Sequence, residues 1–160
     1  MNKRWLEKRD ACTDGVIWFK NQKERSGIKV VKKLIEEKKL DWANWLIVRL
    51  MKYKQYVLYA VYAAEQVNAI YEKKYPANKR PREAIEAAKK CIKSPTKKNK
   101  SAAFDAASAS YAAYAASYAA SAASAASAAS YAASAASDAR QRMKLKILEY
   151  GIKLLGGVYE

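Results

Sequence analysis

Lysine and arginine side chains gather between residues 80 and 100, and the chemistry open to them is the attraction of anions. The candidate contacts to nucleic acid or another anionic partner are Arg80, Arg82, Lys89, Lys90, Lys93, Lys97, Lys98 and Lys100. Such groups bind phosphate oxygens and supply most of the affinity in non-specific nucleic-acid binding. Arginine is scarce beside lysine, and no recognition-helix signature accompanies the cluster. A solvated face that serves only solubility is the competing interpretation.

The excess of positive charge is concentrated in the first 100 residues. The chain of 160 residues carries a net charge of +16. Residues 1–100 hold 26 Lys or Arg and 11 Asp or Glu, whereas residues 101–160 hold 5 and 4. A surface of this sign attracts nucleic acid, an anionic membrane surface or an acidic protein. Composition alone does not choose among these partners.

Residue types that most catalytic sites need are missing. The chain has no histidine, which removes the commonest general base, the Ser-His-Asp triad and most zinc sites. Two cysteines cannot fill a structural zinc site, and the five glycines form no phosphate-binding loop. Carboxylate pairs such as Glu83 and Glu86 lie among lysines, where surface ion pairs are expected. We therefore expect no catalytic residue, metal ligand or cofactor, and we predict that the protein is not an enzyme.

Cysteine usage and hydropathy bear on the compartment. A disulfide between Cys12 and Cys91 is arithmetically allowed, but two free, buried thiols in a reducing cytosol are expected. No N-terminal segment has the continuous apolar core of a signal peptide, and no stretch approaches the roughly 20 apolar residues of a membrane span. These features predict a cytoplasmic protein with no membrane partner.

Helices must carry the basic residues, because helical spacing recurs in almost every segment before residue 100. The expected helices lie around Trp5, from Val16 to Ser26, over residues 28–36, from Asp41 to Met51, up to Pro76 and from Pro81 to Ile92. Thr13–Gly15 is expected to end the first helix, and Asp41 to cap a later one. Pro81 suits a first turn, and the helix that follows is expected to face Ala84, Ala88 and Cys91 inward. The helix over residues 28–36 is expected to be amphipathic. Residues 93–101 are either a basic loop or the start of the next helix, with Ser94 as its cap.

An alanine-rich tract follows at residues 101–137, with serine or tyrosine at about every third position. It contains no Gly and no Pro, and Ala is the best helix former, so we predict helix. One straight helix of this length would span about 55 Å, whereas a compact chain of this size is nearer 40 Å across. We therefore predict a central Ala/Ser-rich helical hairpin with its turn between Ser117 and Ser127.

The fold class predicted from these elements is all-α, a compact multi-helix bundle around that hairpin. A C-terminal amphipathic helix, ended by Gly156 and Gly157, is expected to complete it. The chain has the size of one domain and no Pro/Ser-rich spacer divides it, so we predict a single helical domain over residues 1–160.

Four sequence fragments carry a family resemblance. They are ACTDGVIWF at 11–19, DWANWLIVRLM at 41–51, KRPREAIEAAKKCI at 79–92 and DARQRMKLKILEYGI at 138–152, with the alanine-rich tract between the last two. Their order and spacing resemble immunity proteins of bacteria and their phages, an all-helical group associated with polymorphic toxin systems. Residues 80–88 are the most specific part. The resemblance implies an inhibitory or partner-binding role without catalysis, and it implies no particular functional residues.

These observations favour a non-catalytic helical binding protein that acts as a stoichiometric inhibitor of a toxin or host-defence component. An inhibitor needs only shape and charge, and a basic half suits an acidic or nucleic-acid-handling protein partner. The alternative is direct nucleic-acid binding through the basic residues 1–100. A homodimer formed through alanine faces is compatible with the sequence.

Overall fold

The computed structural model describes residues 1–74, 76–77, 79–99, 101 and 131–158. Within these residues the regular secondary structure is helical and no strand occurs, which confirms the all-α class. The predicted alanine-rich hairpin, with its turn between Ser117 and Ser127, lies outside the described residues. The compact arrangement of the bundle around it stays a prediction.

The chain divides into two compact units. The first comprises Met1–Lys52 together with Leu148–Glu160, and the second comprises Tyr53–Ile147. The single helical domain predicted over residues 1–160 stays a prediction.

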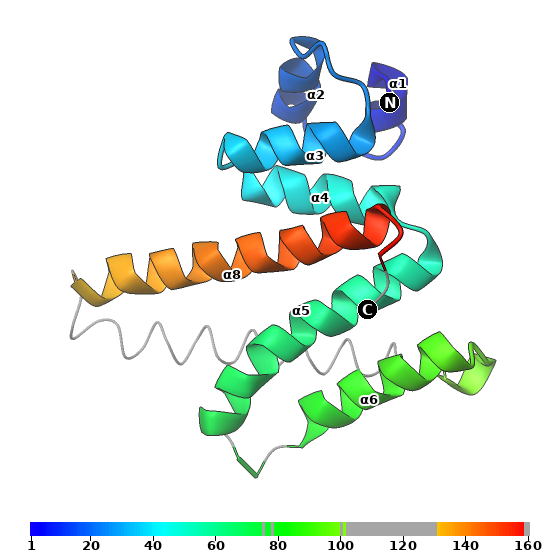
Figure 1. Cartoon of the computed structure of the whole chain (residues 1–160), viewed down its shortest axis with the longest axis vertical. Helices are drawn as coiled ribbons and strands as arrows, with labels where there is room; N and C mark the ends of the chain where they lie inside the picture. Colours follow the sequence, from blue (N-terminus) through cyan, green and yellow to red (C-terminus); the bar gives the residue numbers. More distant parts are fainter. Residues whose placement is uncertain (75, 78, 100, 102–130, 159–160) are drawn as a thin grey trace. The chain divides into compact units, whose positions relative to one another are not determined.

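Four short helices and the end of a long one build the first unit (Figure 1). They are α1 (Lys3–Glu7), α2 (Thr13–Lys20), α3 (Gly27–Glu36), α4 (Leu40–Leu50) and the last part of α8 (Tyr131–Leu155). α1 packs against α2, and α3 packs against α4. A Cβ on Gly27 would lie 2.7 Å from Leu50 Cδ1, so the start of α3 lies against the end of α4. The α3–α4 pair is therefore an antiparallel hairpin.

Two helix boundaries differ from those expected. Thr13–Gly15 begins α2 instead of ending the preceding helix, because α1 already ends at Glu7 and the chain turns at Asp10 with a φ of 57°. Asp41 is not the cap of α4. The turn after α3, with Lys38 at a φ of 58° and the Lys39 N–H bonded to the Leu34 carbonyl at 2.8 Å, restarts the helix at Leu40.

Aliphatic side chains fill the core of the first unit. Val31, Ala43, Ile47 and Leu154 are completely buried, and Leu148 is nearly so. The amphipathic face predicted for residues 28–36 is present in α3, whose buried residues include Val31 and Leu34. α8 ends before Gly156, as predicted, and Gly157 has a φ of 87° that glycine adopts without strain.

The second unit is built around α5 (Tyr53–Lys74) and α6 (Arg80–Lys93), which pack against each other. Pro81 lies in the first turn of α6, and Ala84 and Cys91 are buried, as predicted. Ala88, which was predicted to face inward, is only half-buried, whereas Ile85 is buried. Burial raises the pKa of Tyr59, on α5, to about 12.

Both cysteines are free thiols. Cys91 is buried as predicted, and its Sγ lies 3.3 Å from the Tyr53 hydroxyl in a hydrogen bond that raises the pKa of Tyr53. The prediction that Cys12 is buried is wrong. Cys12 precedes α2 in the N-cap position, outside the face of the helix that packs, and it is exposed.

No helix in the parts of the chain that the structure describes combines the length and the apolar character needed to cross a membrane.

Candidate anion-binding surface

The lysines and arginines predicted to contact anions lie on α6 and in the segment after it. Arg80 is the first residue of α6, although only its backbone is described, and Lys100 lies outside the described residues. After α6 the chain becomes helical again at residues 97–99, so the second of the two expectations for residues 93–101 is met. Its cap is Thr96 instead of Ser94, because the Asn99 N–H donates to Thr96 Oγ1 at 3.2 Å.

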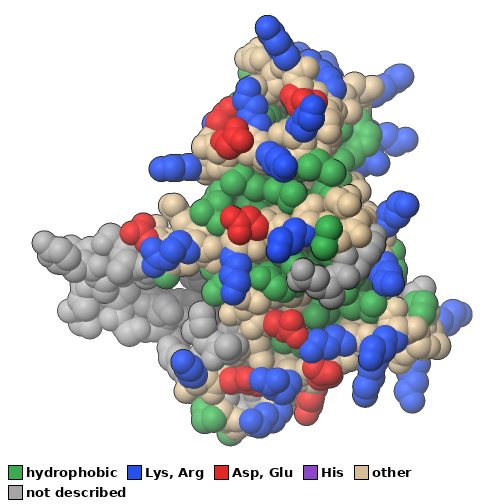
Figure 2. All heavy atoms as spheres, in the orientation of Figure 1, with side chains coloured by type: hydrophobic (Ala, Val, Ile, Leu, Met, Phe, Trp, Pro, Cys, Tyr) green, Lys and Arg blue, Asp and Glu red, His purple; other side chains and the backbone are tan. Residues whose placement is uncertain are grey.

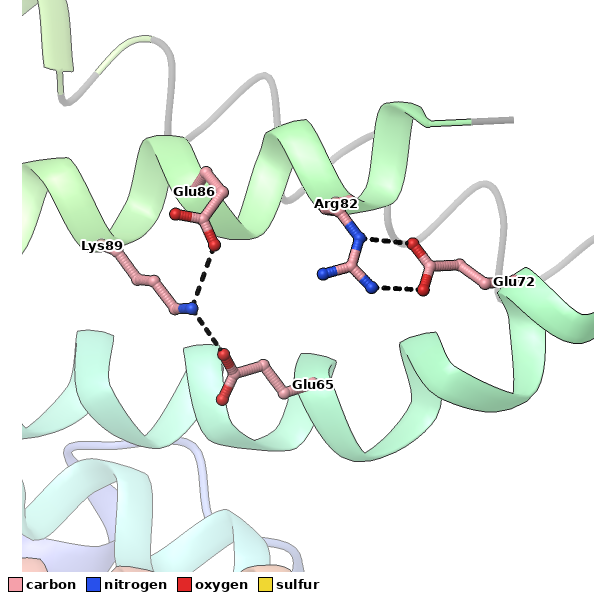
Figure 3. A network of polar contacts seen from close by, with 5 residues as sticks. All are labelled: Glu65, Glu72, Arg82, Glu86 and Lys89. Carbon is pink, nitrogen blue, oxygen red and sulfur yellow. Dashed lines mark hydrogen bonds and ion pairs between the residues drawn. The ribbon is translucent and has the colours of Figure 1, made fainter. Parts of the chain in front are cut away.

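Arg82 is held by a carboxylate of the same unit (Figure 3). Its Nε donates to Glu72 Oε1 at 2.6 Å, and its Nη2 forms an ion pair with Glu72 Oε2. The hydrogen bonds from Arg82 hold the pKa of Glu72 below its usual range, and those to Glu72 raise the pKa of Arg82. This two-point geometry is the one that guanidinium groups use to bind carboxylates or phosphates, so an internal partner already occupies it.

Lys89 bridges two helices in the same network. Its Nζ lies 2.7 Å from Glu65 Oε1 on α5 and 3.0 Å from Glu86 Oε1 on α6 (Figure 3). Hydrogen bonds to Glu65 and then Glu86 raise the pKa of Lys89. Two of the predicted anion contacts therefore tie α6 to α5.

Four of the predicted contacts remain exposed. Lys90, Lys93, Lys97 and Lys98 form no ion pair within the described part of the chain. Blue side chains gather in Figure 2 where Figure 1 shows the end of α6. The Asn99 amide donates to the Ser94 carbonyl at 2.7 Å and fixes the turn that carries the last two lysines.

A hollow of about 570 Å³ opens beside these lysines. Its lining is Lys79, Arg82, Glu83, Glu86, Ala87, Lys90, Lys98 and Asn99. Lysine and glutamate side chains share this wall, so the hollow presents both signs of charge. A surface of mixed sign is complementary to another protein's charged groups.

A second recess, in the first unit, was not predicted from the sequence. It has a volume of about 310 Å³. Its lining is Met1, Leu6, Asp10, Ala11, Cys12, Gly15, Trp18, Phe19, Val30, Leu34, Asp41, Trp42, Trp45 and Leu46. The signal in the sequence was the placement of all four tryptophans within residues 5–45. Periodicity assigned them to helix faces and could not show that they converge.

Several cationic side chains of the first unit lie over aromatic rings. The guanidinium carbon of Arg49 lies 3.9 Å from the Trp45 ring centroid, and that of Arg9 lies 4.1 Å from the Trp5 centroid. Arg25 lies over Phe19 at 4.7 Å, and Lys39 Nζ lies 6.0 Å from the centroid of Trp42. These distances are those of cation–π contacts.

Among the residues that the structure describes, no group of three His, Cys, Asp or Glu side chains could hold a metal ion. No family model, curated protein or solved structure matches the chain. The immunity-protein resemblance therefore rests on the sequence fragments alone.

Proposed function

We propose that the protein is a non-catalytic helical binding protein that inhibits a toxin or host-defence component by occupying its surface. The observation that carries the proposal is the group of exposed lysines at the end of α6, namely Lys90, Lys93, Lys97 and Lys98, without ion pairs in the described part of the chain. Beside them, Arg82 and Lys89 are neutralised by internal carboxylates. The lysines are thus the charges left for a partner.

The mixed charge of the hollow supports a protein partner with an acidic surface. Glu83 and Glu86 share the hollow with Lys90 and Lys98. Side chains of a protein partner can place carboxylates near the lysines and a donor near Glu83, whereas a polyphosphate backbone has only negative charge to offer. Exposed charges of this kind mainly raise the association rate, and added salt weakens the attraction between them and the partner.

Retention of one acidic protein from lysate tests the proposal. The tagged chain is compared with a variant in which Lys90, Lys93, Lys97 and Lys98 are glutamine, with nuclease present and at two salt concentrations. The control variant changes four exposed lysines of the first unit to glutamine, Lys8, Lys20, Lys23 and Lys32, which removes equal charge. We expect the parent and the control to retain an acidic protein in a 1:1 ratio with the tagged chain. The α6 variant should retain at least tenfold less of that protein.

Direct nucleic-acid binding is the second candidate, because the same four lysines lie within nine residues of sequence. If the chain binds nucleic acid directly, nuclease should remove the material that the chain retains from lysate. Its affinity for a 20-nucleotide single strand should also fall steeply as salt is added. Equal retention by the α6 variant and the control would overturn both candidates, since neither would then depend on this surface.

A further inference from the structure

The recess in the first unit has the size and wall of a small-molecule site. Its volume of about 310 Å³ lies at the lower end of the range for ligand pockets, and such pockets are mostly apolar with a few polar groups. Three tryptophans and Phe19 contribute rings to the lining, with leucine and valine side chains from α1, α3 and α4. An occupant must therefore bring an apolar body, most favourably a flat one.

The charge of this wall is opposite to that of the chain. Asp10 and Asp41 line the recess, and no lysine or arginine side chain does, although the chain carries 31 of them. Met1 also lines it, and its ammonium group donates to the Arg25 carbonyl at 2.7 Å. The two carboxylates outnumber this one ammonium group, which is already bonded to a carbonyl, so the complementary head group is a cation.

Three rings of the wall already act as cation partners. Arg25, Lys39 and Arg49 lie over Phe19, Trp42 and Trp45, yet none of these three cations lines the recess. Part of each ring therefore faces the recess while a cation covers another part. Aromatic walls with adjacent carboxylates are suited to organic ammonium groups.

A hydrogen bond fixes one of the walls. The Trp18 indole N–H donates to Glu37 Oε2 at 2.7 Å, and Lys39 Nζ donates to the same oxygen at 2.8 Å. The ring of Trp18 then meets that of Trp42 edge to face, with 6.4 Å between centroids and an interplanar angle of 67°. Rings held in this way lose little freedom when a ligand arrives, which favours binding.

The geometry points to a binding site in this recess for a small organic cation, an amine with an aromatic or similarly flat apolar body, held by the tryptophan rings and by the carboxylates of Asp10 and Asp41. The site is separate from the lysine surface of α6 and does not depend on the function proposed for it.

Three probes of equal shape and different charge test the site. They are 4-phenylbutylamine, neutral 4-phenylbutan-1-ol and anionic 4-phenylbutyrate, each titrated into the full chain by calorimetry. N-acetyllysinamide, a cation without the aromatic body, is the fourth probe. We expect the amine to bind at least tenfold more tightly than each of the other three. Equal affinities, a preference for the acid, equal binding of N-acetyllysinamide, or no binding of the amine at 10 mM would each overturn the proposal.

Variants test whether the two carboxylates, and not the apolar cavity alone, cause the preference for the amine. Asp10→Asn with Asp41→Asn is expected to remove the preference for the amine and to leave binding of the alcohol unchanged; asparagine tolerates the left-handed backbone of Asp10. The matched control, Glu7→Gln with Glu36→Gln, removes two exposed carboxylates that do not line the recess. This control variant should keep the preference for the amine. Loss of the preference in the control would show that the overall charge of the chain causes it, and would overturn the assigned site.

A second readout uses the parent chain alone. The exposed thiol of Cys12 lines the recess and buried Cys91 does not. Saturating 4-phenylbutylamine should slow alkylation of Cys12 by iodoacetamide at least threefold, while the acid at the same concentration should not. An unchanged rate with the amine bound would place the amine elsewhere and overturn the site.

Discussion

Arginine side chains in the two units have different partners. In the first unit, Arg9, Arg25 and Arg49 lie over aromatic rings. In the second unit, Arg82 and Lys89 pair with carboxylates across the α5–α6 contact. A net charge of +16 is therefore not one binding surface. Part of it serves the fold, and only the cations left without such partners are available for another molecule.

The buried side chains of the two units differ in type. Large aliphatic residues such as Val31 and Ile47 are completely buried in the first unit, whereas the buried residues of the second include Tyr59, Ala84 and Cys91. Burial of large aliphatic groups supplies most of the free energy of folding, and exposed ion pairs contribute little. We expect the first unit to depend on packing and the α5–α6 pair to be sensitive to pH and salt.

The largest expected effect comes from the core of the first unit. Ile47→Ala should lower the free energy of unfolding by about 3 kcal/mol, because it leaves a cavity in a fully buried site. Urea unfolding followed by tryptophan fluorescence measures this, since all four tryptophans lie in the first unit. Ile17→Ala, at a side chain that is 52% exposed, is the control and should stay within about 0.5 kcal/mol.

The same experiment tests whether the two units unfold together. Far-UV circular dichroism reports the helices of both units, whereas tryptophan reports only the first. Coincident transitions in the parent and in Ile47→Ala would support the predicted single domain. A fluorescence transition that moves to lower urea while much of the helical signal remains would show two domains.

A smaller effect is expected from the cations over the rings. Arg49→Gln should lower the stability of the first unit by about 0.5–1 kcal/mol, because it removes the guanidinium group from the face of Trp45. Lys32→Gln, at an exposed lysine without a ring contact among the described residues, is the comparison in the same urea assay. An equal loss in both variants would mean that the ring contact adds nothing.

The smallest effect, and the most sensitive to pH, is expected at the ion pair of the second unit. The pKa of Glu72 is lowered in the folded chain by Arg82, so the stabilisation is present above the ordinary pKa of a glutamate and disappears as the pH falls through the folded value. Arg82→Gln should therefore lower the melting temperature slightly at pH 7. The difference from the parent should begin to shrink below pH ~4.3, the ordinary pKa of a glutamate, and should vanish once the pH is below the lowered pKa of folded Glu72.

Salt and a neighbouring lysine provide the controls for that pair. The difference at pH 7 should also shrink at 1 M salt, since both partners are partly exposed. Lys90→Gln, which changes an exposed lysine without a described ion pair, should produce no such pH dependence. A difference for Arg82→Gln that persists at pH 2 would indicate a packing role for the arginine stem.

The sequence predicts the helices of this protein better than the surfaces they create. Local signals were sufficient for α6, where Pro81 marks the first turn and Ala84 and Cys91 follow at inward positions. They failed at Thr13–Gly15, because Asp and Gly are as compatible with a first turn as with a helix end. The pairing of Arg82 with Glu72 depends on how α5 and α6 are aligned, which periodicity does not contain.

The tryptophan recess could not be predicted from the sequence for the same reason. Its wall draws on four helices, and Trp18 and Trp42 meet only because α2 lies near the start of α4. Residue spacing predicts which face of a helix is apolar, but not which faces enclose a space. The basic residues of α6 and of the segment after it were predicted as candidates, yet which of them pair with carboxylates depends on how α5 and α6 pack.

The division of the first unit between the two ends of the chain has a consequence for its synthesis. Leu148 and Leu154 are buried with the unit that residues 1–52 begin, and the whole second unit is translated in between. On the ribosome, α1 to α4 emerge early and can form their local pairs, but two of their aliphatic partners are still unmade. The apolar surface that α8 later covers is exposed throughout that interval, so it is available to a chaperone that binds nascent chains.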